Sequence, residues 1–272
     1  MLALIGLGLE AEDISLKGLK LVQACDTVYL EKYTSILLDE SEIERVIGRK
    51  PLPAFREDIE ASCTDPKVLQ EAQTKSVALL VVGTPLFATT HTELLIRAQE
   101  LNIPVQTIHN ASIQSVMGCC GFNSYGFGRT VSIPFFLKEW RVYDFYQNIM
   151  ANYQNGLHTL CLLDIKINEP TLETLMGKEN KRYTRFMSID EAINQIQEAA
   201  QHWQSNDLQD QKIVGVERFG QATEQYTYGT LQELATRTYG PPLHAIIIPS
   251  NKGSSMEREY VERFFNHTST TQ

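Results

Sequence analysis

The sequence predicts an α/β fold with two domains, on the strength of three observations. From residue 2 to residue 108, short apolar runs alternate with amphipathic stretches of helical length, which is the pattern of a parallel sheet with flanking helices. Residues 77–82 form a continuous apolar run, which is typical of a strand buried on both faces. A chain of 272 residues is long enough for one large domain or two of ordinary size.

The N-terminal domain is expected to span residues 1–115 and to contain a mostly parallel sheet covered by helices. Ser15 is a suitable N-cap for the first of these helices. The predicted strands are residues 2–5, 27–30, 77–82 and 103–108. The predicted helices are residues 16–24, 38–46, 66–75 and 92–101.

Beyond Ser112 the chain becomes glycine-rich and loses its helical periodicity, so we place a second α/β domain at residues 116–267. A disordered tail is expected at residues 268–272. Ser188 and Glu191 form the pattern of a capping box. The predicted strands are residues 130–133, 157–167, 213–218, 226–230 and 243–248. The predicted helices are residues 143–153, 189–203 and 256–265.

Composition disfavours several classes of function. The chain has 24 Lys and Arg against 33 Asp and Glu, a formal charge of −9, which argues against nucleic acid as a partner. No apolar run approaches the roughly 20 residues that span a bilayer, and the N-terminus lacks the basic leader of a signal peptide. The five cysteines form no CxxC pair, so we expect buried thiols in a cytoplasmic protein, with no disulfide framework and no zinc site. They are Cys25, Cys63, Cys119, Cys120 and Cys161.

The most informative turn follows the apolar run at residues 77–82. Gly83 lets a ligand approach the backbone closely, and Pro85 fixes the turn. Ligands of open α/β sheets bind outside the carboxyl ends of the strands, so we expect the binding site here. Small hydroxyl side chains near two strand ends suit hydrogen bonds to an amino-acid or ribose group, although such residues also form turns by themselves. They are Thr84, Thr89, Thr90 and Ser112.

A glycine-rich turn follows the first expected strand. Its Gly6-x-Gly8-x-x-Ala11 segment formally matches a dinucleotide-binding fingerprint, with Glu31 near the position of the ribose-binding acid. Acidic side chains nevertheless occupy the stretch where a pyrophosphate would rest, and the next helix begins late. These side chains are Glu10, Glu12 and Asp13. Two alternatives to nucleotide binding stay open: a turn that only connects strand to helix, and a turn that touches a ligand without phosphate.

Three further polar residues each allow a functional and a structural interpretation. His91 and His109 are either bases or ligands, or they hydrogen-bond the turns beside them. No second histidine or carboxylate lies at metal-ligand spacing, so no metal is predicted. Asp164 follows a buried strand, where it either orders a substrate or caps the next turn.

Several segments, taken in order along the chain, closely resemble the diphthine synthases, within the tetrapyrrole-methylase-like class of S-adenosylmethionine enzymes. The HNASI and GCCG versions resemble the eukaryotic branch, which adds four methyl groups and yields diphthine methyl ester. The matching segments are MLALIGLGLEAEDISLKGL, VYLEKYTSIL, GTPLFATTHTELLIRA, IHNASIQSVMGCCGF, FGRTVSIPFF, QNGLHTLCLLDIKI and GPPLHAII.

This resemblance implies a two-domain α/β fold, a homodimer, and S-adenosyl-L-methionine held in the cleft between the domains, with S-adenosyl-L-homocysteine as product. The implied substrate is translation elongation factor 2, at a histidine that carries a 3-amino-3-carboxypropyl group in diphthamide biosynthesis. No catalytic side chain is implied. The implied donor-binding residues are Leu9, Thr84, Phe87, Ser112, Ile113, Leu163, Phe219 and His244.

The chain departs from the family pattern at the central turn. The family has Gly-Asp-Pro there, whereas this chain has Gly83-Thr84-Pro85, and a small family residue is Phe87. Loss of a carboxylate removes a charge-assisted hydrogen bond of about 1.5–3 kcal/mol, so weaker donor binding is expected. The alternative is a weakly active or non-catalytic member that acts as a binding module. A nicotinamide-dependent dehydrogenase, suggested by the glycine fingerprint, is a third hypothesis.

Overall fold

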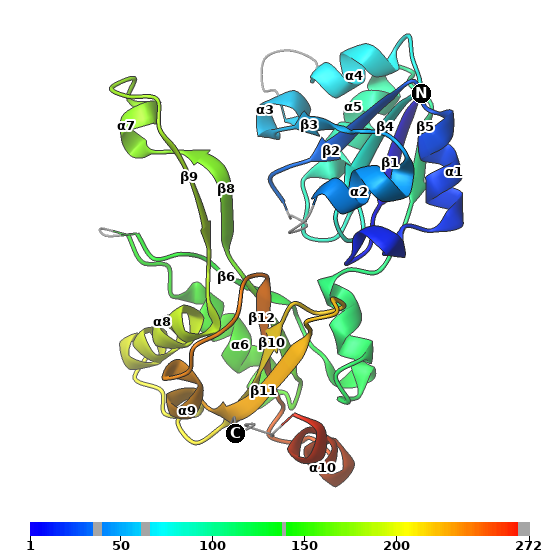
Figure 1. Cartoon of the computed structure of the whole chain (residues 1–272). Helices are drawn as coiled ribbons and strands as arrows, with labels where there is room; N and C mark the ends of the chain where they lie inside the picture. The colour runs from blue at the N-terminus through cyan, green and yellow to red at the C-terminus, as the bar shows by residue number, and fades with distance from the viewer. Residues whose placement is uncertain (35–39, 61–65, 138–139, 266–272) are drawn as a thin grey trace. The chain divides into compact units, whose positions relative to one another are not determined.

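The computed structural model describes residues 1–34, 40–60, 66–137 and 140–265, which form two compact units (Figure 1). Unit 1 comprises Met1–Gln114 and Lys166–Thr184, and unit 2 comprises Ser115–Ile165 and Arg185–Gln272. The sequence predicts two continuous domains divided at residue 115. In the structure, residues 166–184 belong to unit 1 although they follow that boundary in the chain. Cys63 and the predicted tail at residues 268–272 lie outside the described residues.

Unit 1 contains a five-stranded parallel sheet with the strand order β3-β2-β4-β1-β5. Every residue of β1 and β4 is buried, so the prediction of a central strand buried on both faces is confirmed. The strands are β1 (Leu2–Gly6), β2 (Thr27–Glu31), β3 (Leu52–Ala54), β4 (Val77–Val81) and β5 (Val105–Ile108).

Helices cover both faces of this sheet, and each face has its own apolar core. One core includes Leu94 of α5 and Val68 of α4, and the other includes Val22 of α1 and Ile43 of α2. The Ser15 hydroxyl accepts a hydrogen bond from the Gly18 amide at 3.1 Å, as its predicted role as N-cap requires. The helices are α1 (Leu16–Ala24), α2 (Glu40–Ile47), α3 (Arg56–Ile59), α4 (Lys67–Ala72) and α5 (His91–Glu100), with a short 3-10 helix η1 (Ala11–Asp13).

Unit 2 contains a mixed five-stranded sheet with the order β11-β10-β12-β7-β6, in which only β6 and β7 pair in parallel. Its helices are α6 (Asp144–Gln154), α8 (Ile189–His202), α9 (Leu231–Ala235) and α10 (Ser255–Phe264), with a 3-10 helix η3 (Ser124–Gly126). The 3-10 helix η2 (Ile113–Gly118) begins in unit 1 and ends in unit 2. Its strands are β6 (Val131–Ile133), β7 (Thr159–Leu163), β10 (Lys212–Glu217), β11 (Gln225–Thr230) and β12 (His244–Ile248).

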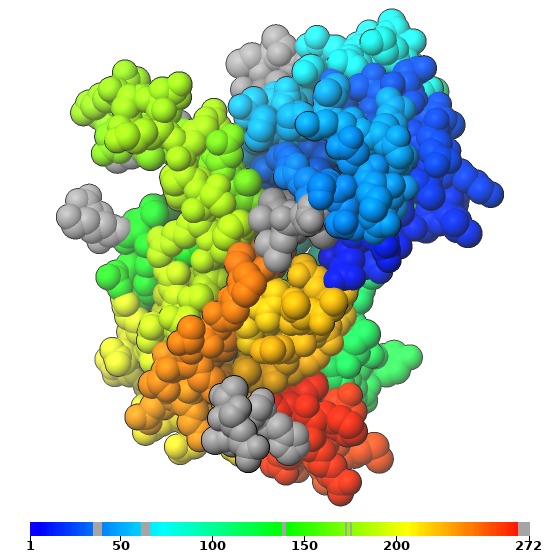
Figure 2. Space-filling view, in the orientation of Figure 1, coloured from blue at the N-terminus to red at the C-terminus, as the bar shows by residue number. Residues whose placement is uncertain are grey.

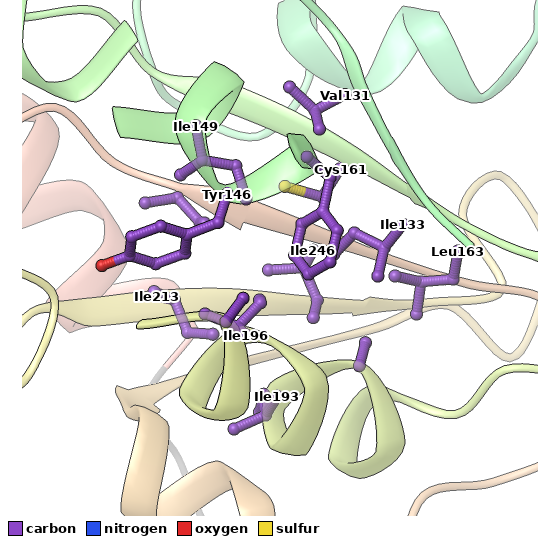
Figure 3. Close-up of a cluster of buried hydrophobic side chains, with 14 of the residues drawn as sticks. Val131, Ile133, Tyr146, Ile149, Cys161, Leu163, Ile193, Ile196, Ile213 and Ile246 are labelled. Carbon is purple, nitrogen blue, oxygen red and sulfur yellow. The ribbon is translucent and has the colours of Figure 1, made fainter. Parts of the chain in front are cut away.

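The core of unit 2 lies between the sheet and the helices α6 and α8. Ile193 and Ile196 of α8, Ile246 of β12 and Cys161 of β7 are all buried in this core, and Figure 3 shows Ile196 on the side of α8 toward the sheet. At the other end of the unit, α10 lies at the molecular surface (Figure 2). Because each unit has its own core, each can hold its loops in place independently.

Two sequence predictions in this region need correction. The strand predicted over residues 157–167 is interrupted at Asp164, which separates β7 from β8 (Ile165–Pro170). β8 forms a two-stranded hairpin with β9 (Arg182–Phe186), and α7 (Leu172–Leu175) lies between them. The capping box at Ser188 is half formed, because its hydroxyl accepts from the Glu191 amide at 3.4 Å while the Glu191 carboxylate pairs with Arg185.

Candidate functional site

The carboxyl ends of β1, β4 and β5 bring three turns of unit 1 together. β1 lies between the other two strands, so the turns that follow the three strands emerge side by side. The turns after β1 and β4 are joined by two backbone hydrogen bonds: the Gly8 amide donates to the Gly83 carbonyl at 3.1 Å, and the Gly83 amide donates to the Gly8 carbonyl at 2.7 Å. This is the edge at which the sequence predicts a ligand.

Gly6 and Gly8 in these turns leave no room for a side chain. A Cβ at Gly6 would lie 2.7 Å from the Gly83 carbonyl oxygen, and a Cβ at Gly8 would lie 2.3 Å from the Asp13 Cβ. Gly8 and Gly83 also have φ values of +84° and +79°, a region that glycine adopts without strain. The glycines therefore allow the turns after β1, β4 and β5 to pack closely against one another at the end of the sheet.

The Asp13 carboxylate accepts hydrogen bonds from backbone amides of the first turn. Its Oδ2 accepts hydrogen bonds from the amides of Leu9 and Glu10, each at 2.9 Å. A dinucleotide fingerprint would direct such amides at a pyrophosphate. Because a carboxylate already neutralises them, the geometry favours the alternative of a ligand without phosphate over the nucleotide interpretation.

Asn110, which sequence reasoning did not single out as a functional residue, links all three turns. Its Nδ2 donates to the Gly6 carbonyl at 3.1 Å and to the Asp13 carbonyl at 2.9 Å. Its amide donates to the Thr84 Oγ1 at 3.3 Å. The position of Asn110, two residues after the end of β5, is the one signal that could have identified it, since asparagine often hydrogen-bonds turn backbone.

The predicted residues of unit 1 lie on these turns. Leu9 follows Gly8 and is half-buried. Thr84 and Phe87 belong to the turn after β4 and are also half-buried. In that turn the Phe87 amide donates to the Thr84 carbonyl at 3.4 Å. Ser112 is 6% exposed, and its hydroxyl accepts from the Gln114 amide at 3.3 Å. Ile113 begins the 3-10 helix η2.

His91 has the structural role that its position beside a turn allows. It is fully buried, and its Nδ1 donates to the Pro85 carbonyl at 2.8 Å, while Thr89 donates to the same carbonyl at 2.6 Å. Burial lowers the pKa of His91 below its ordinary value, so the ring is neutral. Thr90 instead donates to Glu60, and His109 is exposed.

The three predicted residues of unit 2 lie at strand ends of its own sheet. Leu163 ends β7 and is 8% exposed, Phe219 follows β10 and is 8% exposed, and His244 begins β12. The His244 Nε2 donates to the Gly240 carbonyl at 3.2 Å. Its Nδ1 is buried and has no hydrogen-bond partner among the described residues. Nε2 of His91 is in the same state, so the Nδ1 of His244 can accept a hydrogen bond from a ligand but does not by itself indicate one.

Asp164 caps a turn. Its Oδ2 accepts from the Phe135 amide at 3.1 Å, its own amide donates to the Ile133 carbonyl at 3.1 Å, and its carbonyl accepts from the Met187 amide at 3.0 Å. These contacts favour the structural interpretation of Asp164. Within the described ranges, no group of three or more His, Cys, Asp or Glu side chains is arranged to hold a metal ion. No helix there is long and apolar enough to cross a bilayer.

Comparison with known proteins identifies the family. A model of the tetrapyrrole (corrin/porphyrin) methylases matches residues 1–235. The chain is 42% identical to the diphthine methyl ester synthases of Mus musculus and Homo sapiens, in alignments 272 residues long that cover 97% of this chain and 96% and 95% of theirs. A crystal structure of a proposed diphthine synthase from Entamoeba histolytica superposes with a TM-score of 0.84 at 36% identity, covering 98% of this chain and 99% of that one. The chain therefore belongs to the tetrapyrrole (corrin/porphyrin) methylase family and is an S-adenosylmethionine-dependent methyltransferase.

Proposed function

We propose that this enzyme methylates translation elongation factor 2 at the histidine that carries a 3-amino-3-carboxypropyl group. The steps add four methyl groups and yield diphthine methyl ester in diphthamide biosynthesis. The observation that supports this substrate most strongly is the 42% identity to two diphthine methyl ester synthases over nearly all of each chain. Because the match covers nearly all of each chain, no domain is present in one protein and absent from the other. The chain therefore has every part that a common function would need.

The site residues suit S-adenosyl-L-methionine. Gly6 and Gly8 let the turns after β1, β4 and β5 pack closely together, and Asp13 makes the nearby amides poor phosphate ligands. The unpaired Nδ1 of His244 can accept a hydrogen bond from an adenosyl amino or hydroxyl group. We propose that the donor contacts Leu9, Thr84, Phe87, Ser112, Ile113, Leu163, Phe219 and His244.

Methyl transfer needs alignment more than it needs a catalytic side chain. The bound donor supplies a sulfonium methyl group, which is already activated for displacement. The protein must hold the acceptor nitrogen in line with that methyl carbon, about 3–3.5 Å away, and must exclude water. Backbone turns and short polar side chains are sufficient for this task, so we assign no catalytic residue.

A cytoplasmic homodimer is the form we propose for the active enzyme. The dimer rests on likeness to the family. The compartment rests on the cysteines, because Cys25, Cys119, Cys120 and Cys161 are all free thiols, as in proteins from a reducing environment.

The decisive experiment uses elongation factor 2 isolated with the 3-amino-3-carboxypropyl-histidine intermediate. The enzyme is incubated with this factor and with S-adenosylmethionine labelled in the methyl group. We expect label in the factor and a mass increase of four methyl groups on the modified peptide. Factor with an unmodified histidine serves as the control and should remain unlabelled. No incorporation into the confirmed intermediate would contradict the proposed activity, whereas fewer methyl groups would correct only their number.

A further inference from the structure

Two consecutive charged residues are buried at the end of β10. Glu217 is 3% exposed and Arg218 is 5% exposed, and the Arg218 Nη1 donates to the Glu217 Oε2 at 3.1 Å. Removing two charges from water is costly unless their remaining hydrogen-bonding capacity is satisfied. The other partners of Arg218 therefore indicate what the ion pair does in the fold.

The Arg218 guanidinium joins two loops of unit 2. Its Nη1 donates to the Pro241 carbonyl at 2.9 Å, in the loop before β12. Its Nε donates to the Thr223 Oγ1 at 2.9 Å, and its Nη2 donates to the Thr223 carbonyl at 3.0 Å, in the loop after β10. A planar guanidinium with fixed donor directions can satisfy this set, whereas a lysine ammonium cannot.

The backbone around the ion pair is fixed in the same way. The Gly240 amide donates to the Glu217 Oε2 at 2.9 Å, and the Arg218 amide donates to the Leu243 carbonyl at 2.8 Å. Arg218 itself has a φ of +50°, which is uncommon for a residue with a side chain. A Cβ at Gly240 would lie 2.6 Å from the Arg218 Nη1, so the two loops pack closely on the guanidinium.

We propose that Arg218, held by Glu217, is a positioning residue for binding of the methyl donor. This inference rests on the proposed function, which places Phe219 and His244 against the donor. Phe219 is the next residue after Arg218, and His244 follows Leu243, whose carbonyl accepts from the Arg218 amide. The same loop fixes the His244 ring, because the Gly240 carbonyl accepts a hydrogen bond from Nε2–H, which leaves Nδ1 as the acceptor nitrogen of the neutral ring.

A purely structural role predicts a different result from a positioning role. A structural residue would lower the melting temperature of its variants without changing the donor affinity of the folded protein. A positioning residue changes that affinity, because displacement of a binding group by about 1 Å can cost up to about 10²-fold. A small guanidinium compound that enters the vacated space should then restore the affinity.

The test compares four proteins by calorimetry with S-adenosylhomocysteine and by thermal melting of the same samples. They are the wild type, Arg218→Ala, Arg218→Lys and the control Arg129→Ala. Arg129 is also in unit 2 but is exposed and donates to Asn148 at 2.9 Å. We expect both Arg218 variants to bind about tenfold or more weakly, the control to bind as the wild type does, and methylguanidinium to improve binding to Arg218→Ala alone.

If the Arg218 variants do not fold, Thr223→Val tests the positioning role of Arg218 instead. It removes only the Oγ1 acceptor at 2.9 Å, and a severalfold loss of affinity is expected. Wild-type affinity in the folded variants, or a loss that methylguanidinium leaves unchanged, overturns the inference while the proposed function stands. Failure of the wild type to bind S-adenosylhomocysteine contradicts the proposed function and the inference together.

Discussion

At the scale of single residues, Thr84 stands where the resemblance to the diphthine synthases leads us to expect an aspartate. Its Oγ1 accepts a hydrogen bond from the Asn110 amide at 3.3 Å, so the hydroxyl fills the acceptor role that the family's aspartate can also fill. It adds no negative charge beside the proposed position of the donor, which carries a sulfonium and an ammonium group. The turn is therefore preserved while its attraction for a cation is reduced.

Replacement of Thr84 by aspartate should strengthen donor binding. A charge-assisted hydrogen bond is worth about 1.5–3 kcal/mol, and 1.4 kcal/mol corresponds to about tenfold in affinity. We expect the dissociation constant of S-adenosylmethionine, measured by calorimetry, to fall about tenfold in Thr84→Asp. Thr84→Val is the matched control: it keeps the size of the side chain, removes the acceptor for the Asn110 amide and should weaken binding. Equal affinities for wild type and Thr84→Asp would show that the lost carboxylate is compensated elsewhere.

At the scale of elements, the turn between β1 and η1 depends on two separate properties of glycine. Gly8 has a φ of +84° and a close neighbour in Asp13. Gly48, at the end of α2, has a φ of +75°, but a Cβ added there would have no atom within 4 Å. Comparison of the two positions separates backbone strain from steric contact.

Gly8→Ala should therefore destabilise the protein more than Gly48→Ala does. Both substitutions place alanine in the left-handed region, at about 1–2 kcal/mol each. Only Gly8→Ala also overpacks the turn, which typically costs about 1–3 kcal/mol more. Urea unfolding measures both free energies, and donor affinity should fall in Gly8→Ala alone. Equal losses of stability would mean that the turn relaxes around the new methyl group.

Elements with a strong apolar pattern are predictable from the sequence, and elements defined by distant contacts are not. The central strand β4 is visible in residues 77–82 because both of its faces are buried. The hairpin of β8 and β9 is not visible, because all six residues of β8 are only half-buried and show no alternation. Its placement in unit 1 involves ion pairs to α3, from Arg56 to Glu169 at 3.3 Å and from Arg182 to Glu57 at 3.5 Å.

The candidate site follows the same rule. Thr84 and Ser112 could be found because they come directly after apolar strands, where parallel sheets collect their ligands. Asn110 and Arg218 also follow strands, but the contacts that define their roles are distant in sequence: Gly6 lies 104 residues from Asn110, and Pro241 lies 23 residues from Arg218. The spacing of residues along the chain does not predict such long-range contacts.

At the scale of the whole molecule, each unit encloses a neutral histidine. His91 in unit 1 is fully buried and His158 in unit 2 is 2% exposed. Burial lowers the pKa of both rings below the ordinary value of 6.5, and for His158 the neighbouring Glu257, at 3.4 Å, opposes this effect only in part. The His158 Nδ1 accepts from the Ser250 amide at 2.9 Å, a bond that protonation of Nδ1 would break.

The free energy of unfolding should consequently fall as the solution is acidified. Below about pH 6.5 the unfolded chain takes up protons on these histidines while the folded chain does not, so their stabilising contribution is present above that pH and is lost below it. For one histidine the loss is at most about 1.4 kcal/mol per pH unit. Glu31 has the opposite sign, because burial raises its pKa, so the wild-type curve alone does not isolate the histidines.

The matched variants His91→Asn and His158→Asn separate these effects unit by unit. Asparagine can keep the hydrogen bond to the Pro85 carbonyl in the first case and to the Ser250 amide in the second, but it does not titrate. Urea unfolding from about pH 7.5 to about pH 5.5 should show each variant less stable than the wild type at the upper pH and closer to it at the lower one. A difference that stays constant over this range would mean that the folded protein protonates these rings as readily as the unfolded chain does, and that burial does not hold them neutral.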